Sequence, residues 1–256
     1  MALSKNTIKY LKSLHLKKFR QKYNKFMVEG DKMARELLLQ TNFRVEELYA
    51  TASWMEDNRV FTQLPHAQAT VVTENELQQI SSLTTPNQVV AVLTQPEVLW
   101  KEQRWSDWVL YLDGIQDPGN MGAILRIADW FGLYPLFCSP TTVEAYNPKV
   151  IQASMGAFIR VPMAVVTLSD LIDFAPTRAI WGADLAGLDA FQAAWPSQGV
   201  LVIGSEGAGL YEETKALLHE RVTIPKGKEG GAESLNAAVA TGILCSACFR
   251  GSKKAG

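Results

Sequence analysis

The stretch LDGIQDPGNMG, residues 112–122, passes from an apolar run through a Gly/Pro/Asp loop into the start of a helix. Residues 108–112 predict a strand, and residues 120–131 predict a helix that Asn120 would cap. Two later stretches repeat the change from strand to loop, VLVIGSEGAGL at 200–210 and IPKGKEGGAESLN at 224–236. The second half of the chain is therefore expected to present three polar loops at the ends of apolar strands.

The remaining second half alternates short apolar strands with helical segments. The further strands are predicted at 135–138, 161–166, 179–183, 200–203 and 222–224, and the further helices at 148–157, 210–218 and 235–249. Apolar strands separated by helices predict an α/β fold with a parallel sheet that is covered on both faces. Ligands of such sheets bind beyond the carboxyl ends of the strands, where the three loops lie.

The first half alternates less regularly. Residues 30–40 and 74–80 predict helices, the second opened by a capping box of Thr73 and Glu76, and residues 45–50, 69–72 and 88–93 predict strands. The stretch 96–107, with Pro96, mixed charges and two tryptophans, is expected to be a linker. The predicted organisation is a domain at 1–95, a linker at 96–107 and a second domain at 108–256.

The composition is that of a soluble globular protein, with 47% hydrophobic and 20% charged residues in 256. No apolar run approaches the roughly 18 residues of a membrane span, and the first residues lack the apolar core of a signal peptide. We therefore expect a cytoplasmic protein without a membrane partner. Cys245 and Cys248 form a CxxC in an apolar helical stretch without a second ligand pair, which favours helix packing over a redox or metal site, and no metal is expected.

Positive charge gathers at the N-terminus although the net charge is −1. No acidic residue precedes Glu29, so this segment can attract phosphates, although a solvated helix face explains it as well. Phe19, Tyr23 and Phe26 interleave with the basic residues, and Phe26 could equally be part of the core. The candidate RNA contacts within the run are Lys17, Lys18, Arg20 and Lys22.

Within the three loops, a few polar side chains stand out. Arg126 lies among apolar residues, where a guanidinium usually needs an anionic partner, although a capped helix with a surface arginine is the simpler reading. Glu206 is a single carboxylate among glycines, in a spacing that differs from the dinucleotide-binding fingerprint. Ser234 is placed as a helix cap, and Asn236 would lie just inside that helix, where asparagine is a poor helix former.

The order of these motifs resembles the SpoU (TrmH-type) RNA 2′-O-ribose methyltransferases of the SPOUT superfamily. The resemblance rests on Asn120-x-Gly122-x-x-x-Arg126, on Gly204-x-Glu206-x-x-Gly209-Leu210, and on Ile224-Pro225 followed by Ser234-Leu235-Asn236. The stretches NPKV (147–150) and ASMGA (153–157) also look like family sequence. The first half is more loosely similar, through FMVEG (26–30), to a ribosomal-protein-like α/β substrate-binding domain.

The resemblance implies a deep trefoil knot, a homodimer, and S-adenosylmethionine as methyl donor in a pocket near the dimer interface. Carried onto matching positions, the catalytic residues would be Asn120, Arg126, Glu206, Ser234 and Asn236. The backbone around Gly204, Ile224 and Leu235 would hold the adenine and ribose of the donor, with Ile203 and Gly209 beside them. The loop 226–233 is longer and richer in glycine than is usual for the family.

The expected reaction is methyl transfer to a ribose 2′-hydroxyl of structured RNA, with ribosomal RNA favoured and transfer RNA open. His15, His66 and His219 lie outside the loops, so no histidine is expected as the base. Because arginine stays protonated, Arg126 would orient the hydroxyl and stabilise alkoxide charge, with Glu206 fixing the guanidinium. A non-catalytic RNA-binding or ribosome-assembly factor and a nucleotide-dependent oxidoreductase are the alternatives from other classes.

Overall fold

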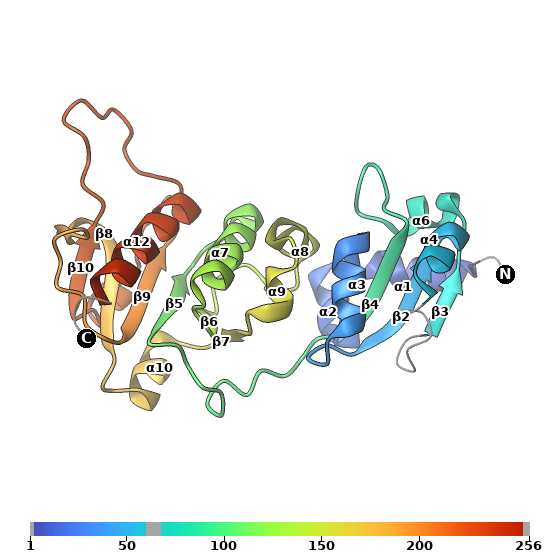
Figure 1. The fold of residues 1–256 in the computed structure, drawn as a ribbon, viewed down its shortest axis with the longest axis horizontal. Helices are drawn as coiled ribbons and strands as arrows, with labels where there is room; N and C mark the ends of the chain where they lie inside the picture. Colours follow the sequence, from blue (N-terminus) through green and yellow to red (C-terminus); the bar gives the residue numbers. More distant parts are fainter. Residues whose placement is uncertain (1–2, 60–67, 253–256) are drawn as a thin grey trace. The chain divides into compact units, whose positions relative to one another are not determined.

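The computed structural model describes residues 3–59 and 68–252. Contacts divide the chain into two compact units, one of residues 1–97 and 144–159 and the other of residues 98–143 and 160–256 (Figure 1). The first unit therefore takes in a segment from inside the predicted second domain. The predicted ranges 1–95, 96–107 and 108–256 remain a proposal.

The first unit is built on a four-stranded sheet of order β1-β4-β2-β3. In this sheet β4 runs antiparallel to β1 and β2, and β3 runs parallel to β2. The capping box of Thr73 and Glu76 is confirmed at the start of α6. The elements are α1 (Lys5–Ser13), α2 (Lys17–Tyr23), β1 (Lys25–Glu29), α3 (Asp31–Leu39), β2 (Val45–Ala50), α4 (Ala52–Asp57), β3 (Gln68–Val71), α6 (Glu74–Ile80), β4 (Val89–Thr94) and α8 (Pro148–Ser154).

An aromatic cluster holds residues 144–159 within the first unit. Phe26 of β1 lies 4.5 Å from Tyr146 between ring centroids, and Phe43 lies 5.5 Å from Phe158. All four side chains are buried. Phe26 is thus a core residue, which settles the choice that the sequence left open for it.

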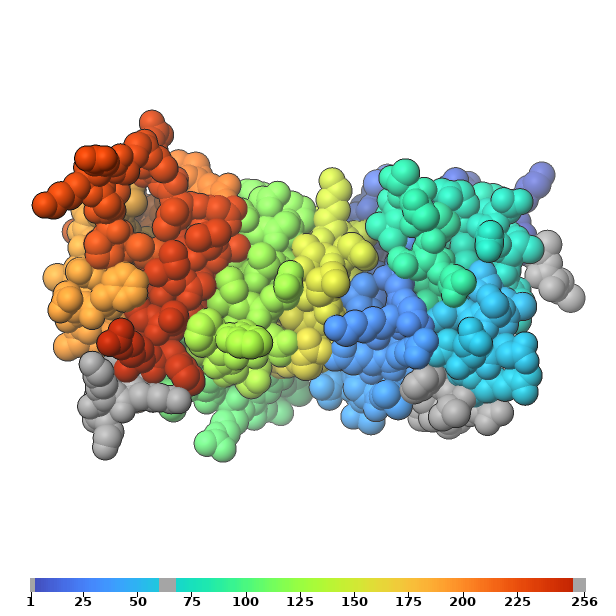
Figure 2. Space-filling model, turned by 45° about the horizontal axis from the view of Figure 1, so that its top comes forward, coloured from blue at the N-terminus to red at the C-terminus, as the bar shows by residue number. Residues whose placement is uncertain are grey.

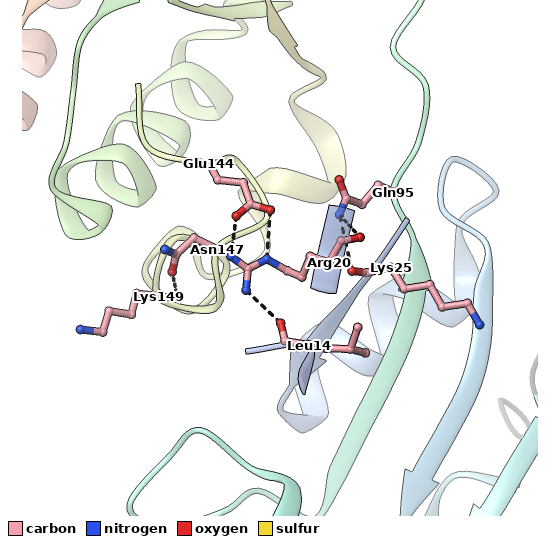
Figure 3. Close-up of polar contacts among 7 residues, drawn as sticks. All are labelled: Leu14, Arg20, Lys25, Gln95, Glu144, Asn147 and Lys149. Carbon is pink, nitrogen blue, oxygen red and sulfur yellow. Dashed lines mark hydrogen bonds and ion pairs between the residues drawn. The ribbon is translucent and has the colours of Figure 1, made fainter. Parts of the chain in front are cut away.

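A buried ion pair joins the same two parts of the unit (Figure 3). Arg20 of α2 donates from Nε and Nη2 to the two carboxylate oxygens of Glu144, at 3.0 and 2.5 Å, and from Nη1 to the carbonyl of Leu14 at 2.9 Å. Only 2% of the Arg20 side chain is exposed, against 14% for Glu144. A planar guanidinium suits such a bidentate contact, and the third bond to a carbonyl compensates its loss of water.

The second unit contains a six-stranded, fully parallel sheet of order β10-β8-β9-β5-β6-β7. One face of the strands, including Val109, Tyr111 and Val202, packs in a cluster with Leu171 of α10. Helix α12 packs against α7 and β9. The elements are β5 (Trp108–Asp113), α7 (Pro118–Phe131), β6 (Leu136–Cys138), α9 (Ala157–Arg160, at the boundary between units), β7 (Met163–Val165), α10 (Leu168–Phe174), β8 (Ala179–Asp189), β9 (Gly199–Gly204), α11 (Glu212–Lys215), β10 (Glu220–Thr223) and α12 (Ala237–Ser252).

The predicted α/β fold with a parallel sheet is confirmed, but several element boundaries were wrong. The helix expected at 148–157 is split into α8 and α9, because Met155 and Gly156 have positive φ values of 51° and 92°. The helix expected at 210–218 is reduced to α11, and the strand expected at 179–183 continues to Asp189. The sequence reading missed β1, α4 and α10.

Cys245 and Cys248 are buried free thiols in α12, so the CxxC is a packing feature, as predicted. Among the described residues, no His, Cys, Asp and Glu side chains gather as a metal site would require. The described helices are also too short or too polar to cross a membrane.

The ion pair between Arg20 and Glu144 can be tested by a double-variant cycle. Arg20→Leu alone should lower the free energy of unfolding by about 3 kcal/mol, because it leaves a largely buried carboxylate without its partner. Adding Glu144→Leu should recover at least half of that loss, since two apolar side chains then fill the space. Urea denaturation followed by circular dichroism measures both values, and a double variant as unstable as the single one would contradict the expectation.

Candidate active site

The three loops singled out in the sequence meet at one edge of the parallel sheet. Strands β5 and β9 lie in parallel register with Asp113 opposite Gly204, so the loops that follow them leave the sheet side by side. The loop after β10 returns to the same place, because Asn236 at its end contacts side chains from both other loops. The topology thus gathers residues that are up to 116 positions apart.

Glu206 is the centre of this cluster. One of its carboxylate oxygens, Oε1, accepts hydrogen bonds from Asn120 Nδ2 at 2.9 Å, from Asn236 Nδ2 at 2.6 Å and from the Ala237 N–H at 3.2 Å. Asn236 Nδ2 also donates to Asn120 Oδ1 at 2.7 Å. Three of the five predicted catalytic residues therefore form one hydrogen-bonded group.

The capping roles predicted for Asn120 and Ser234 were wrong. Asp117 caps α7 by accepting from the Asn120 N–H, and Pro118 supplies the first helical residue, so the Asn120 side chain is left for Glu206. Helix α12 begins at Ala237, and Asn236 is its cap, since its Oδ1 accepts from the N–H groups of Ala238 and Val239. Ser234 is exposed in the loop before the helix.

Arg126 lies on α7 with an exposed side chain, and no hydrogen bond or ion pair joins it to another described residue. The predicted contact with Glu206 is absent from the described part of the chain, where Oε1 of that carboxylate accepts instead from two asparagines and a backbone N–H. Two of the histidines have structural contacts: His15 Nε2 is hydrogen-bonded to the Ile80 carbonyl, and His219 Nδ1 accepts from the Ile180 N–H. His66 lies outside the described residues.

A cavity of about 580 Å³ adjoins the cluster, within the size range of small-molecule sites. It lies between β8, β9, β10 and the loop 224–236, which is the orange-red arch over a hollow in Figure 2. Glu206 and Ser234 line it as well. Its lining includes every position predicted to hold the methyl donor: Ile203, Gly204, Gly209, Ile224 and Leu235.

Two glycines shape the wall of this cavity. A Cβ on Gly204 would come within 2.3 Å of the Gly209 backbone, so no side chain fits there. Gly209 has a positive φ of 67°, and its N–H and carbonyl pair with those of Ser205 at 2.9 and 3.0 Å. The closed turn from 205 to 209 presents Glu206 from a defined backbone.

Asp184 and Lys215 also line the cavity, and sequence reasoning did not single them out. Asp184 contacts Arg221 at 3.7 Å and accepts from the Ala186 N–H at 2.9 Å. The only available signal was position, because Asp184 directly follows the strand predicted at 179–183. The two residues give one wall of the cavity charges of both signs.

Asp113, the last residue of β5, stabilises the same edge of the parallel sheet. Its buried carboxylate accepts from the Tyr211 N–H at 2.9 Å and from the Thr214 hydroxyl. Burial raises the pKa of Asp113 above its ordinary value; those hydrogen bonds oppose the rise, and the nearby Glu213 adds to it. Asp113 therefore ties the segment after the Glu206 loop to the end of β5.

A family model described as the SpoU rRNA Methylase family matches residues 107–246, and one described as the MRM3-like substrate binding domain matches residues 5–91. The chain belongs to the SpoU rRNA methylase family. Its fold is accordingly that of the SPOUT methyltransferases, preceded by a substrate-binding domain.

Individual relatives match almost the whole chain. The 23S rRNA (guanosine(2553)-2′-O)-methyltransferase RlmP of Bacillus subtilis is 31% identical over 245 residues, which is 93% of each chain. The structure of a putative RNA methyltransferase of the TrmH family from Porphyromonas gingivalis is 37% identical, with a TM-score of 0.87 over 97% of this chain and 98% of that one. An AdoMet-bound rRNA methyltransferase from Sinorhizobium meliloti is 26% identical, with a TM-score of 0.87 over 98% of this chain and 97% of that one.

The buried Asp113 predicts a pH-dependent difference between wild type and Asp113→Asn. Since the folded-state pKa of Asp113 is raised, the native protein holds this proton more tightly than the unfolded chain does, and the contribution of Asp113 to wild-type stability falls as pH rises from the ordinary pKa of an aspartic acid to the raised one. The asparagine keeps an acceptor for Tyr211 without burying a charge. Thermal unfolding followed by tryptophan fluorescence measures the melting temperature of both proteins. The melting temperature of the variant relative to that of wild type should rise from acidic to neutral pH, and a difference that does not change with pH would refute this.

Proposed function

We propose that this protein transfers a methyl group from S-adenosylmethionine to the 2′-hydroxyl of a ribose in ribosomal RNA. The observation that carries the proposal is the hydrogen-bonded group of Asn120, Glu206 and Asn236 beside a cavity lined by every predicted donor-binding position. The substrate named for RlmP of Bacillus subtilis, 23S rRNA, supports ribosomal RNA as the acceptor.

The cavity has the chemistry that S-adenosylmethionine requires. Ile203, Ile224 and Leu235 offer apolar contact for an adenine ring, and the glycine backbone of the 204–209 turn admits close approach of a ribose. Asp184 and Lys215 can meet the charged groups of the methionine part. When bound, the donor would supply an activated methyl carbon on its sulfonium: the new C–O bond to the 2′-oxygen forms as the C–S bond breaks, S-adenosylhomocysteine leaves, and the hydroxyl proton passes to solvent.

Arg126 is proposed to act on the acceptor. A guanidinium stays protonated in proteins, so it can orient the 2′-oxygen and the neighbouring phosphate and stabilise the negative charge that develops as the hydroxyl loses its proton. Its exposure on α7 leaves it available for RNA. Glu206 instead fixes the two asparagines, and the exposed hydroxyl of Ser234 at the cavity is available to the acceptor ribose.

A homodimer is part of the proposal. Large apolar side chains are exposed on and next to the packed helices α7 and α12, and the most exposed is Trp130 at 85%. Leu235 is 44% exposed and also lines the cavity, which supports a donor pocket near the interface. Light scattering that finds only monomers would contradict the dimer.

Lysines on α2 are proposed to contact RNA phosphates. Lys17, Lys18 and Lys22 are exposed on this helix. Arg20 is withdrawn from the predicted set, because its guanidinium is buried and engaged by Glu144 and Leu14. The cytoplasmic location remains a prediction, which the free state of all three cysteines supports. The trefoil knot also remains a prediction.

The test of the reaction is methyl transfer from labelled S-adenosylmethionine to large-subunit ribosomal RNA, small-subunit RNA and transfer RNA, with nuclease digestion of the products. Label in a 2′-O-methylated nucleoside of large-subunit RNA is the expected outcome. Arg126→Ala should lower the rate about 100- to 1,000-fold while donor binding in calorimetry stays near wild type. The matched control is Arg104→Ala, another exposed arginine of the second unit.

Other outcomes of this test separate the alternatives. Label only in transfer RNA would change the substrate class and keep the reaction. Donor binding without transfer to any of these RNAs would overturn ribosomal RNA as the acceptor and leave donor binding supported. Absence of donor binding would favour a non-catalytic RNA-binding or ribosome-assembly factor, and full single-turnover activity of Arg126→Ala would remove Arg126 from the mechanism.

The lysines of α2 predict the salt dependence of RNA binding. Replacing Lys17, Lys18 and Lys22 by alanine should reduce the slope of log affinity against log salt by about 2 to 3, because that many phosphate contacts no longer release counterions. Filter binding at several salt concentrations measures the slope, with Lys101→Ala as the control for an exposed lysine elsewhere. An unchanged slope would move the RNA contact to another surface.

A further inference from the structure

The outer side of α2 carries a row of aromatic rings in addition to its lysines. Phe19 and Tyr23 lie one turn apart and stack, with ring centroids 6.2 Å apart and an interplanar angle of 14°. Tyr10 of α1 meets Tyr23 edge-on at 5.2 Å. The Tyr23 side chain is 38% exposed, so part of it is left for another molecule.

The ammonium groups of two lysines lie over these rings. Lys18 Nζ stands 4.9 Å from the centre of the Phe19 ring, and Lys22 Nζ stands 5.4 Å from that of Tyr23. The carboxylate beside this row, Glu47, is engaged by Tyr10, Lys25 and Tyr49. Within the described residues neither Lys18 nor Lys22 is paired with a carboxylate, so the surface combines aromatic rings with cationic groups, the composition of surfaces that bind single-stranded nucleic acid.

The helix is also held in place from within. With seven residues, no side-chain cap and no acidic residue in its first turn, α2 would not be stable in isolation. Arg20 fastens its inner side to Glu144 and Leu14, and Gln95 Nε2 donates to the Arg20 carbonyl at 3.3 Å (Figure 3). The rings and lysines on the outer side are thus arranged before any ligand arrives.

We infer that α2 is a base-stacking platform, on which an unpaired RNA base stacks against Tyr23 while Lys18 and Lys22 hold the flanking phosphates. This rests on the proposed function, and it adds that the N-terminal unit reads a loop or single strand and not a continuous duplex. In a duplex each base is already stacked between its neighbours, so an aromatic side chain gains contact only where the base is unpaired.

The inference can be tested with two RNA probes and the full-length protein. The first is a single-stranded adenosine oligomer of roughly 12 nucleotides, a length within the usual site sizes, and the second is a blunt duplex of the same length. Wild type should bind the single strand more tightly. Tyr23→Ala should weaken single-strand binding about 10-fold, leave duplex binding unchanged and keep the salt slope, because the lost contact carries no charge.

Companion variants separate stacking from folding. Tyr23→Phe should bind as wild type does, since the ring is kept, and Tyr23→Leu should bind as Tyr23→Ala does although it preserves apolar packing against Tyr10. Lys18→Ala with Lys22→Ala should instead lower the salt slope for both probes. Phe191→Ala, at an exposed aromatic residue of the second unit, is the matched control and should change nothing.

Equal weakening of both probes by Tyr23→Ala, normal binding by Tyr23→Leu, or tighter binding of the duplex by wild type would overturn the inference. Methyl transfer to ribosomal RNA by the wild type is measured in parallel. If transfer occurs and Tyr23→Ala binds normally, the platform is wrong and the proposed function stands. If the platform behaves as expected and no RNA is methylated, the proposed function fails alone.

Discussion

The carboxylate of Glu206 is the point on which the arrangement of the site depends. A single oxygen receives donors from α7 and from the start of α12, while the glycine turn that carries it closes on itself. Hydrogen bonds to a charged acceptor are among the stronger ones in proteins, and three of them converge here. Three chain segments are thereby fixed relative to one another, and the wall of the adjoining cavity is fixed with them.

This arrangement explains why the amide side chains at 120 and 236 are suited to their positions. Each amide both donates and accepts, so Asn236 can cap α12 with its oxygen while its nitrogen reaches Glu206 and Asn120. A serine could cap the helix but could not bridge to two partners with one hydroxyl. The residue that caps the helix is therefore also part of the site, and helix geometry is coupled to site geometry.

Much of this could be predicted from the sequence, because the informative features are local. Apolar strands ending in polar, glycine-rich loops predicted a parallel sheet with a site at its carboxyl edge, and Asn120, Glu206 and Asn236 do meet there. The prediction that Asn120 caps α7 was wrong because Asp117, three residues earlier, is an equally good capping residue, and the distant Glu206 carboxylate engages the Asn120 side chain instead. Arg20 was misread for the same reason, since its partner Glu144 lies 124 residues away. Met155 adopts a left-handed backbone conformation, which the methionine residue type does not predict.

The close approach at Gly204 has a consequence for how the chain can vary. Its neighbour across the turn leaves no room even for a methyl group, whereas a Cβ at Gly207, Gly227 or Gly231 would meet nothing within 4 Å. Glycines of the same region are thus under different constraints. Gly204 must be glycine because no space is left for a side chain, whereas no described atom restricts the size of the residue at the other three positions. A collection of functional variants of this chain would preserve position 204 almost without exception and let the other three vary, so tolerance to substitution would separate the glycine held by close packing from the unconstrained glycines around the same cavity.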